Sequence, residues 1–389
     1  MMSVTPTTEL RELLDELKKL AALPLEQATA MPPGVYTSDA LLELEKARIF
    51  GRQWLCAGRS DSILKPGDYL TYEIGTQPIM VVRQEDGDVR AFANVCRHRM
   101  MRLLDGIGAC PRKRITCPYH AWTYAIDGKL VAAPYMRDRA GFDMADYSLA
   151  NVRCEVWEGW VYVTLDPDIE PVAGLLTELQ DVVADYRMAD YVQIVQEDIV
   201  WNSNWKLLTE NFMEGYHLPV AHRATVGAHF PVKDTQFSQL PPNAAFTYQY
   251  FTKETTAPVG NAHPDNTRLK GDQRWTSILL TVFPSHMFAL APDHLWYLSL
   301  QPIGCDRIQI RYGAALAPEV LAASADPDKM KADVVKFLAE VNAEDRFVVE
   351  GIGKGTKAPL SKPGPLCWLE RENHEFTKYL ARQLIGELN

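Results

Sequence analysis

Residues 94–100 read NVCRHRM, and residues 115–122 read ITCPYHAW. These two short motifs contain Cys96 and His98, then Cys117 and His120, and Cys117 follows His98 by 19 positions. Two cysteines and two histidines can bind one zinc ion tetrahedrally. They can equally bind a [2Fe–2S] cluster, with two thiolates on one iron and two imidazoles on the other. A third interpretation is that they are ordinary buried side chains, and the number of ligands alone does not separate the three.

The motifs lie within a stretch of short apolar or alternating runs, from Trp54 to about Leu165. Turn signals at 85–87 and 127–128 separate some of these runs, which predicts a small antiparallel β domain. The predicted strands cover residues 69–74, 79–83, 89–94, 122–125 and 160–165.

Helical patterns precede this stretch at Glu9–Leu23 and Ser38–Arg52, with Ser38 as an N-cap. After it, helical patterns and strand-like runs are mixed, which predicts a sheet packed against helices. We therefore expect an α+β protein with a small antiparallel-β domain at 51–165 and a larger domain with an antiparallel sheet at 166–389. Residues 1–50 are expected to form a helical segment that packs with the larger domain. The main predicted elements of the larger domain are helices near 172–186, 204–217, 328–352 and 371–387, and strands at 246–252, 277–282, 287–290, 295–302 and 308–315.

A second group of candidate ligands lies in residues 202–222, NSNWKLLTENFMEGYHLPVAH. The pattern predicts a helix through about Tyr216, with Glu214 and His217 on one face. Pro219 would end or kink this helix and bring His222 back beside His217. Two imidazoles placed in this way can converge on one metal ion.

A non-haem iron site for oxygen chemistry needs two histidines and one carboxylate on one face of the metal. The predicted helix near 328–352 has an apolar stripe at Val334, Leu338, Val341 and Val348 that also contains Asp345. A lone carboxylate in such a stripe is costly unless it is paired or binds a metal. Asp345 is therefore the predicted third ligand, with a salt-bridged helix residue as the alternative, whereas Glu344 and Glu350 fall off the stripe and are expected to be solvated.

Both groups resemble one known family. Cys-x-His followed by Cys-Pro-Tyr-His-x-Trp is similar to the cluster-binding signature of Rieske domains in the aromatic-ring-hydroxylating oxygenases. Asn-Trp-Lys, Glu-Asn, acid-x-Tyr-His and a later His resemble the catalytic domain of the same family, and Glu-Asp-x-x-Val-Val-Glu resembles its third-ligand segment. The resemblance covers about Tyr36 to Leu384 and departs from the family at Ala121, where Gly is usual; we expect the cluster to survive that change.

The resemblance implies that Cys96 and Cys117 bind one cluster iron and that His98 and His120 bind the other. It also implies a mononuclear iron(II) on His217, His222 and Asp345. In this family an acid at position 214 links a cluster histidine of one subunit to a metal-site histidine of the next. Glu214 would thus connect His120 of one chain to His217 of its neighbour in a head-to-tail homotrimer. Its alternative role, orienting His217 within the chain, is compatible with this one.

The implied activity is that of a terminal oxygenase, mono- or dioxygenase, acting on a small organic molecule with O2. No dinucleotide-binding fingerprint is evident, so NAD(P)H would act through a separate flavin or iron–sulfur reductase. Glu in place of the usual Asp at position 214 resembles the subgroup acting on carnitine and other quaternary amines, by N-demethylation or C–N cleavage. Hydroxylation of an aromatic acid is the alternative, and a Rieske electron carrier or a zinc-binding module are rivals outside the enzyme class. The segment Lys253–Gln273 is expected to be a loop that borders a pocket.

The composition of the chain narrows its possible functional classes and its location in the cell. The chain has 389 residues, of which 47% are hydrophobic, and a net charge of −10, which argues against nucleic-acid binding. No apolar run approaches the roughly 20 residues that span a bilayer, and the N-terminus lacks a signal-peptide pattern. Seven scattered cysteines suit a reducing compartment. We therefore expect a cytoplasmic protein.

Overall fold

The computed structural model describes residues 7–241, 243–253 and 259–386. The first six residues of the expected N-terminal segment, and residues 254–258 of the expected Lys253–Gln273 loop, lie outside the described residues. The chain divides into two compact units: a larger one, Met1–Ile49 with Leu176–Asn389, and a smaller one, Phe50–Leu175. In the part of the chain that the structure describes, no helix is both long and apolar enough to cross a membrane.

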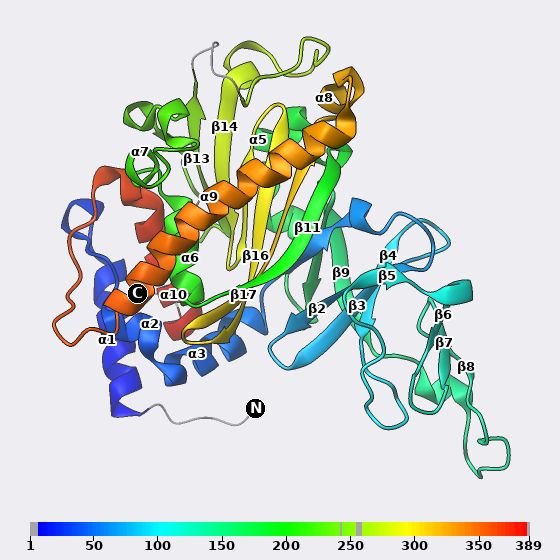
Figure 1. The fold of residues 1–389 in the computed structure, drawn as a ribbon. Helices are drawn as coiled ribbons and strands as arrows, with labels where there is room; N and C mark the ends of the chain where they lie inside the picture. The colour runs from blue at the N-terminus through cyan, green and yellow to red at the C-terminus, as the bar shows by residue number, and fades with distance from the viewer. Residues whose placement is uncertain (1–6, 242, 254–258, 387–389) are drawn as a thin grey trace. The chain divides into compact units, whose positions relative to one another are not determined.

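The smaller unit is built from antiparallel strands, as predicted (Figure 1). Its seven-stranded sheet has the order β1-β10-β9-β4-β3-β2-β5, and a three-stranded sheet has the order β6-β7-β8. Each predicted strand of this region is confirmed within two residues, and the turn signal at 127–128 joins β7 to β8. The elements are β1 (Leu55–Arg59), β2 (Asp68–Ile74), β3 (Gln77–Arg83), β4 (Val89–Ala93), β5 (Ile107–Ala109), β6 (Arg114–Thr116), β7 (Thr123–Ala125), β8 (Leu130–Ala132), β9 (Asn151–Trp157), β10 (Trp160–Thr164) and α4 (Val172–Leu175).

The larger unit contains one seven-stranded antiparallel sheet of order β11-β17-β16-β15-β14-β13-β12. Its strands are β11 (Val192–Trp201), β12 (Gln236–Phe237), β13 (Phe246–Thr252), β14 (Thr276–Val282), β15 (His286–Leu290), β16 (His294–Gly304) and β17 (Arg307–Leu316). Its helices are α1 (Thr8–Ala21), α2 (Pro33–Thr37), α3 (Asp39–Glu45), α5 (Thr177–Val183), α6 (Trp205–Met213), α7 (Leu218–Ala221), α8 (Pro318–Ala323), α9 (Pro327–Gly355) and α10 (Arg371–Ile385). The predicted α+β class, with an antiparallel sheet packed against helices, is confirmed.

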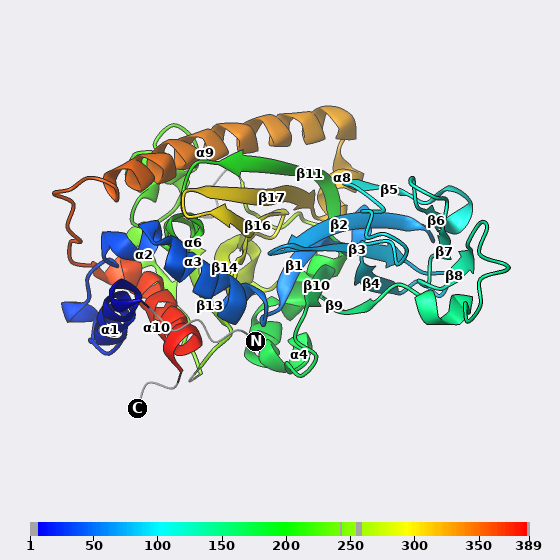
Figure 2. The same ribbon diagram turned by 90° about the horizontal axis from the view of Figure 1, so that it is seen from below.

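Helix α9 runs along one face of this sheet, past β11, β17 and β16 (Figures 1 and 2). Of its apolar positions, Leu338, Val341 and Val349 are buried, which fixes the side of the helix that faces inward. Helix α9 also contacts α6 and α7. It therefore brings residues near position 345 close to residues near position 220.

The N-terminal segment is held to the larger unit by packing and by buried polar contacts. Helix α1 lies beside α10 (Figure 2). In α3, whose N-cap is Ser38 as predicted, Glu45 is fully buried and accepts from Lys206 Nζ at 2.6 Å and from Trp205 Nε1 at 2.7 Å. Removing one partner of a buried ion pair leaves the other charge buried without a partner, which lowers the free energy of unfolding by about 3–5 kcal/mol. This pair therefore anchors α3 to the start of α6.

Candidate functional site

The two Cys/His motifs form two loops with the same backbone hydrogen bonds. In each loop the cysteine N–H donates to the carbonyl five residues later at 2.8 Å, and the N–H four residues later donates back to the cysteine carbonyl at 3.0 Å. These bonds join Cys96 with Met100 and Met101, and Cys117 with Ala121 and Trp122. Two such loops present their ligands in the same way, as a pair.

Both loops require one residue with left-handed backbone geometry, Met100 (φ 55°) and Ala121 (φ 56°). A non-glycine residue pays about 1 kcal/mol for this conformation, because its Cβ approaches the backbone. This is the physical reason why glycine suits the position of Ala121. The loop nevertheless closes with alanine, so the extra methyl group costs stability and leaves the hydrogen bonds intact.

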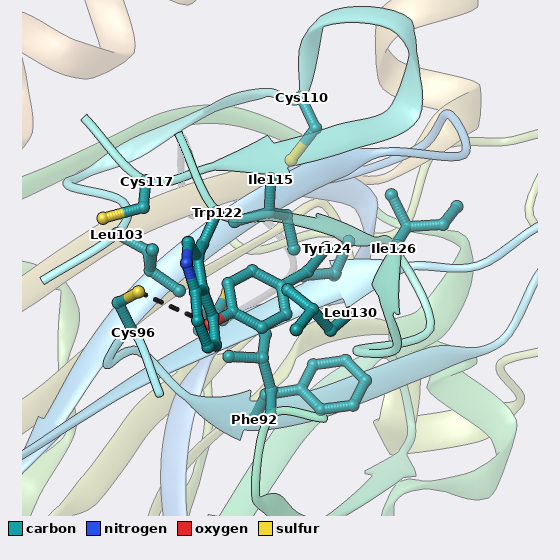
Figure 3. Close-up of a cluster of buried hydrophobic side chains, with 13 residues drawn as sticks. Phe92, Cys96, Leu103, Cys110, Ile115, Cys117, Trp122, Tyr124, Ile126 and Leu130 are labelled. Carbon is teal, nitrogen blue, oxygen red and sulfur yellow. Dashed lines mark hydrogen bonds between the residues drawn. The ribbon is translucent and has the colours of Figure 1, made fainter. Parts of the chain in front are cut away.

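The four candidate cluster ligands separate into buried sulfurs and exposed rings. Cys96 and Cys117 are 2% and 3% exposed. Their sulfur atoms lie on the same side of the group of buried hydrophobic side chains in Figure 3. His98 and His120 are exposed, with ring centroids 4.7 Å apart. Burial raises the pKa of Cys117, whereas the N–H groups of Tyr119 and His120 lower it by favouring the thiolate.

Sequence reasoning missed Tyr124 as part of this group. Its hydroxyl lies 3.4 Å from Cys96 Sγ (Figure 3). The same hydroxyl accepts from the Arg97 N–H at 3.0 Å. Burial raises the pKa of Tyr124, which keeps the phenol protonated and able to donate to a thiolate. A tyrosine on a β-strand carries no sequence signal for this role, because the contact joins β7 to a separate loop 28 residues earlier.

The second candidate site begins where α6 ends, and here the predicted helix is wrong in two respects. Helix α6 stops at Met213, and Glu214 is extended (φ −114°, ψ 147°), so Glu214 and His217 do not share a helix face. Pro219 does not kink a continuing helix but lies in the first turn of α7, where proline is well tolerated. Glu214 is nevertheless beside His217: its Oε1 is 2.5 Å from Nδ1, and its Oε2 accepts from the backbone N–H at 3.0 Å.

His217, His222 and Asp345 converge, although Asp345 follows His222 by 123 residues in the sequence. One ligand atom from each lies within 4.8 Å of the others, and the two rings are 5.1 Å apart at their centroids. Asp345 Oδ1 is 2.9 Å from His222 Nε2 and 3.7 Å from His217 Nε2. In both histidines Nδ1 faces another carboxylate, so each ring directs Nε2 toward Asp345.

Glu344 was expected to be solvated, and this prediction is wrong. Its Oε2 lies 2.8 Å from His222 Nδ1 and accepts from Thr225 Oγ1 at 2.6 Å. Burial lowers the pKa of His222, but hydrogen bonds and charges from Asp345 and Glu344 outweigh it and raise the pKa above its ordinary value. The apolar stripe of α9 did not indicate Glu344, because its partner belongs to a loop 122 residues earlier.

Two family descriptions match this chain. Residues 188–386, just over half of the chain, match the family described as ring hydroxylating alpha subunit (catalytic domain). The chain belongs to this family. Residues 53–152 match the Rieske [2Fe-2S] domain, so this alpha subunit also contains a Rieske domain.

The chain is also similar to individual proteins and to solved structures. The glycine betaine monooxygenase oxygenase subunit of Pseudomonas aeruginosa is 34% identical over 224 residues, which is 57% of this chain and 52% of that protein. The carnitine monooxygenase oxygenase subunit of Escherichia coli is 35% identical over 199 residues, 51% of this chain and 53% of that protein. The chain thus spans about half the length of the curated relatives it matches. A crystal structure of the quaternary ammonium Rieske monooxygenase CntA shares the fold, with a TM-score of 0.82 at 23% identity over 94% of this chain and 98% of that one.

The residues of this alpha subunit fit both cofactors of its family, a [2Fe–2S] cluster and a mononuclear iron. For the cluster, two buried sulfurs lie beside hydrogen-bonding groups, backbone N–H groups at Cys117 and the Tyr124 hydroxyl at Cys96, and two exposed imidazoles lie close to one another. For the iron, two imidazoles and one carboxylate converge, and both imidazoles have their second nitrogen held by an acid. That second contact is the usual way in which metal-binding histidines are oriented.

Proposed function

We propose that this chain is the oxygenase component of a Rieske non-haem iron oxygenase system in the cytoplasm. The observation that supports this best is the presence of two distinct ligand sets, one in each compact unit. A plain electron carrier needs only the Cys/His set. A zinc-binding module needs neither the paired carboxylate contacts of His217 and His222 nor the convergence of Asp345 on both rings.

In this proposal Cys96, Cys117, His98 and His120 hold the cluster, and His217, His222 and Asp345 hold the iron. When bound, the cluster would supply single electrons, and the iron would supply the activation of O2 needed to oxidise a substrate C–H or double bond. Glu214 holds the His217 Nδ1 proton, and Glu344 holds the His222 Nδ1 proton. Both acids thereby fix which ring nitrogen faces the metal.

We propose in addition that Glu214 connects the two centres across a subunit contact in a head-to-tail homotrimer. Its carboxylate already accepts two bonds from His217 and remains 12% exposed. A carboxylate has further lone pairs, and one of them would accept from His120 of the next subunit. A separate reductase fed by NAD(P)H would supply the electrons.

For the substrate we propose a small quaternary amine or betaine, with N-demethylation or C–N cleavage as the outcome. Support comes from the relatives named as glycine betaine and carnitine monooxygenase subunits, and from glutamate at position 214. Hydroxylation of an aromatic acid is the second candidate.

The proposal is tested by metal analysis and oxygen uptake on the purified, iron-loaded protein. We expect about three irons and two acid-labile sulfides per chain, with a red-brown visible spectrum. His217→Ala should keep the cluster spectrum and lose substrate-dependent oxygen uptake. Glu214→Ala should keep the cluster and the iron but lose oxygen uptake. The control is Glu158→Ala, which changes an acid of the smaller unit outside both ligand sets and should keep the cluster, the iron and the oxygen uptake. A colourless protein with stoichiometric zinc would overturn the proposal.

A further inference from the structure

The larger unit contains a cavity of about 220 Å³ whose walls are mainly apolar. This volume lies below the usual range for ligand pockets and suits a small substrate. Its walls come from the segment after His222, from strands β14 to β17, from helices α8 and α9, and from Lys253 and Val259. Its lining residues include Val226, Phe230, Lys253, Trp296, Phe337 and Leu338, together with the acid Asp293.

The cavity adjoins the candidate iron site along two chain segments. Val226 follows His222 by four residues, and Leu338 precedes Asp345 by two helical turns, about 10 Å along α9. Phe230, Trp296 and Phe337 pack on one hydrophobic cluster with Leu218, Val226, Phe251 and Val341. A molecule in the cavity would therefore lie within one small molecule's length of the iron ligands.

Lys253 is the unusual member of this wall. It directly follows β13 and is only 5% exposed, although a buried ammonium is costly. Its Nζ donates to the Val259 carbonyl at 3.1 Å and lies 5.6 Å from the centre of the Phe230 ring. Burial lowers the pKa of Lys253 to about 8, with Asp293 acting in the opposite direction.

The surroundings of Lys253 hold the ammonium in place. A Cβ added at Gly260 (φ +79°) would fall 1.8 Å from Nζ, so the lysine head occupies the space that any side chain there would need. The nearby acid, Asp293, accepts from the Gly260 N–H at 2.8 Å and lies 2.6 Å from His294 Nδ1. Its carboxylate is thus already engaged by two other groups.

We infer that Lys253 binds the carboxylate of the substrate, with the rest of the molecule directed along Phe230, Trp296 and Phe337 toward the iron ligands. This inference rests on the proposed oxygenase function and specifies its substrate class. An ammonium has three N–H donors, one of which goes to the Val259 carbonyl, and a carboxylate is the group that best uses the others. The aromatic walls accommodate either an apolar ring or a quaternary ammonium group.

Betaines and aromatic acids each carry a carboxylate, whereas a quaternary amine such as choline does not. The experiment therefore uses matched pairs that differ in the acid group: glycine betaine against choline, and benzoate against benzamide, with L-carnitine as a further acid. Each is titrated by calorimetry into iron-loaded holoenzyme without oxygen. The variant is Lys253→Met, which keeps an unbranched chain and removes the charge, and the control is Lys233→Met at an exposed lysine of the same unit.

We expect at least one acid to bind the wild-type enzyme more tightly than its neutral counterpart. Lys253→Met should weaken binding of that acid by roughly 10- to 100-fold, the usual range for a lost charge-assisted hydrogen bond, and leave the neutral molecule unchanged. Lys233→Met should change neither, and Lys253→Arg should recover part of the preference. The pair whose acid loses affinity in Lys253→Met shows whether the substrate is a betaine or an aromatic acid.

The inference is overturned if no acid binds, if acids bind no better than their neutral counterparts, or if Lys253→Met keeps the preference. Iron, sulfide and oxygen uptake are measured on the same samples, so a failure of the proposed function is seen separately. A protein with both metals that takes up oxygen, yet is indifferent to the charge of Lys253, would refute only the carboxylate contact.

Discussion

Replacing Glu344 by alanine should loosen the candidate iron site without touching a proposed ligand. Glu344 makes two short contacts, 2.8 Å from His222 Nδ1 and 2.6 Å from Thr225 Oγ1, and His222 is only 2% exposed. Alanine would leave the buried Nδ1 group without this acceptor and the ring free to change tautomer. Losing such an orienting acid typically costs 10- to 100-fold in metal affinity, or about 1.4–2.8 kcal/mol.

The assay is iron retention against graded concentrations of a chelator, with the cluster's visible spectrum as the internal reference for intact protein. Glu344→Gln keeps an oxygen acceptor at the same place, so its loss should be several-fold smaller. Glu340→Ala, one helical turn earlier and exposed, is the matched control and should retain iron like the wild type. Equal iron retention by Glu344→Ala and Glu340→Ala would show that the acid does not orient His222.

Three further changes test other contacts. Tyr124→Phe removes the hydroxyl beside Cys96 and should lower the cluster's reduction potential by about 40 mV, the equivalent of one hydrogen bond of about 1 kcal/mol; an unchanged potential in a spectroelectrochemical titration would contradict this. Ala121→Gly should raise the free energy of unfolding by about 1 kcal/mol, measured in denaturant, because glycine adopts φ 56° without strain; no gain would mean that the loop relaxes. Burial raises the pKa of Glu210 to about 8, so the contribution of Glu210 to the free energy of unfolding declines as pH rises from about 4.5 to 8. Glu210→Gln can still accept from Tyr36, so its free energy of unfolding should exceed that of the wild type by a few kcal/mol across that range. Parallel curves of stability against pH for the two proteins would argue against this reasoning.

Much of this fold is visible in the sequence because its signals are local. The strands β13 to β17 are apolar runs bounded by turn residues, and each was predicted within two residues. Strand β11 was missed, although it is long and pairs with β17. It carries Gln196, Glu197 and Asp198 and lies at the sheet edge, where polar side chains are tolerated and the alternating pattern is weak.

The end of α6 shows how a local signal can mislead. The spacing of Glu214 and His217 suits a helix face, but Glu214 is extended and its carboxylate binds the His217 backbone and ring instead. A short acid-to-backbone contact competes with the helical hydrogen bond, and Pro219 favours the start of a new helix. His217 and His222 lie close together as predicted, but the backbone between them follows a different path from the predicted kinked helix.

The sequence by itself determined the two motifs of candidate cluster ligands, since Cys-x-His and Cys-x-x-His lie within single loops and chain connectivity sets their spacing. It also indicated Asp345, because one carboxylate in an apolar helical stripe is conspicuous. Only the tertiary structure showed that Glu344 holds His222, that Tyr124 faces Cys96, and that Lys253 lines an apolar cavity. These contacts join residues far apart in the chain, and they exist because helices and loops pack at particular angles, which no periodicity within one segment encodes.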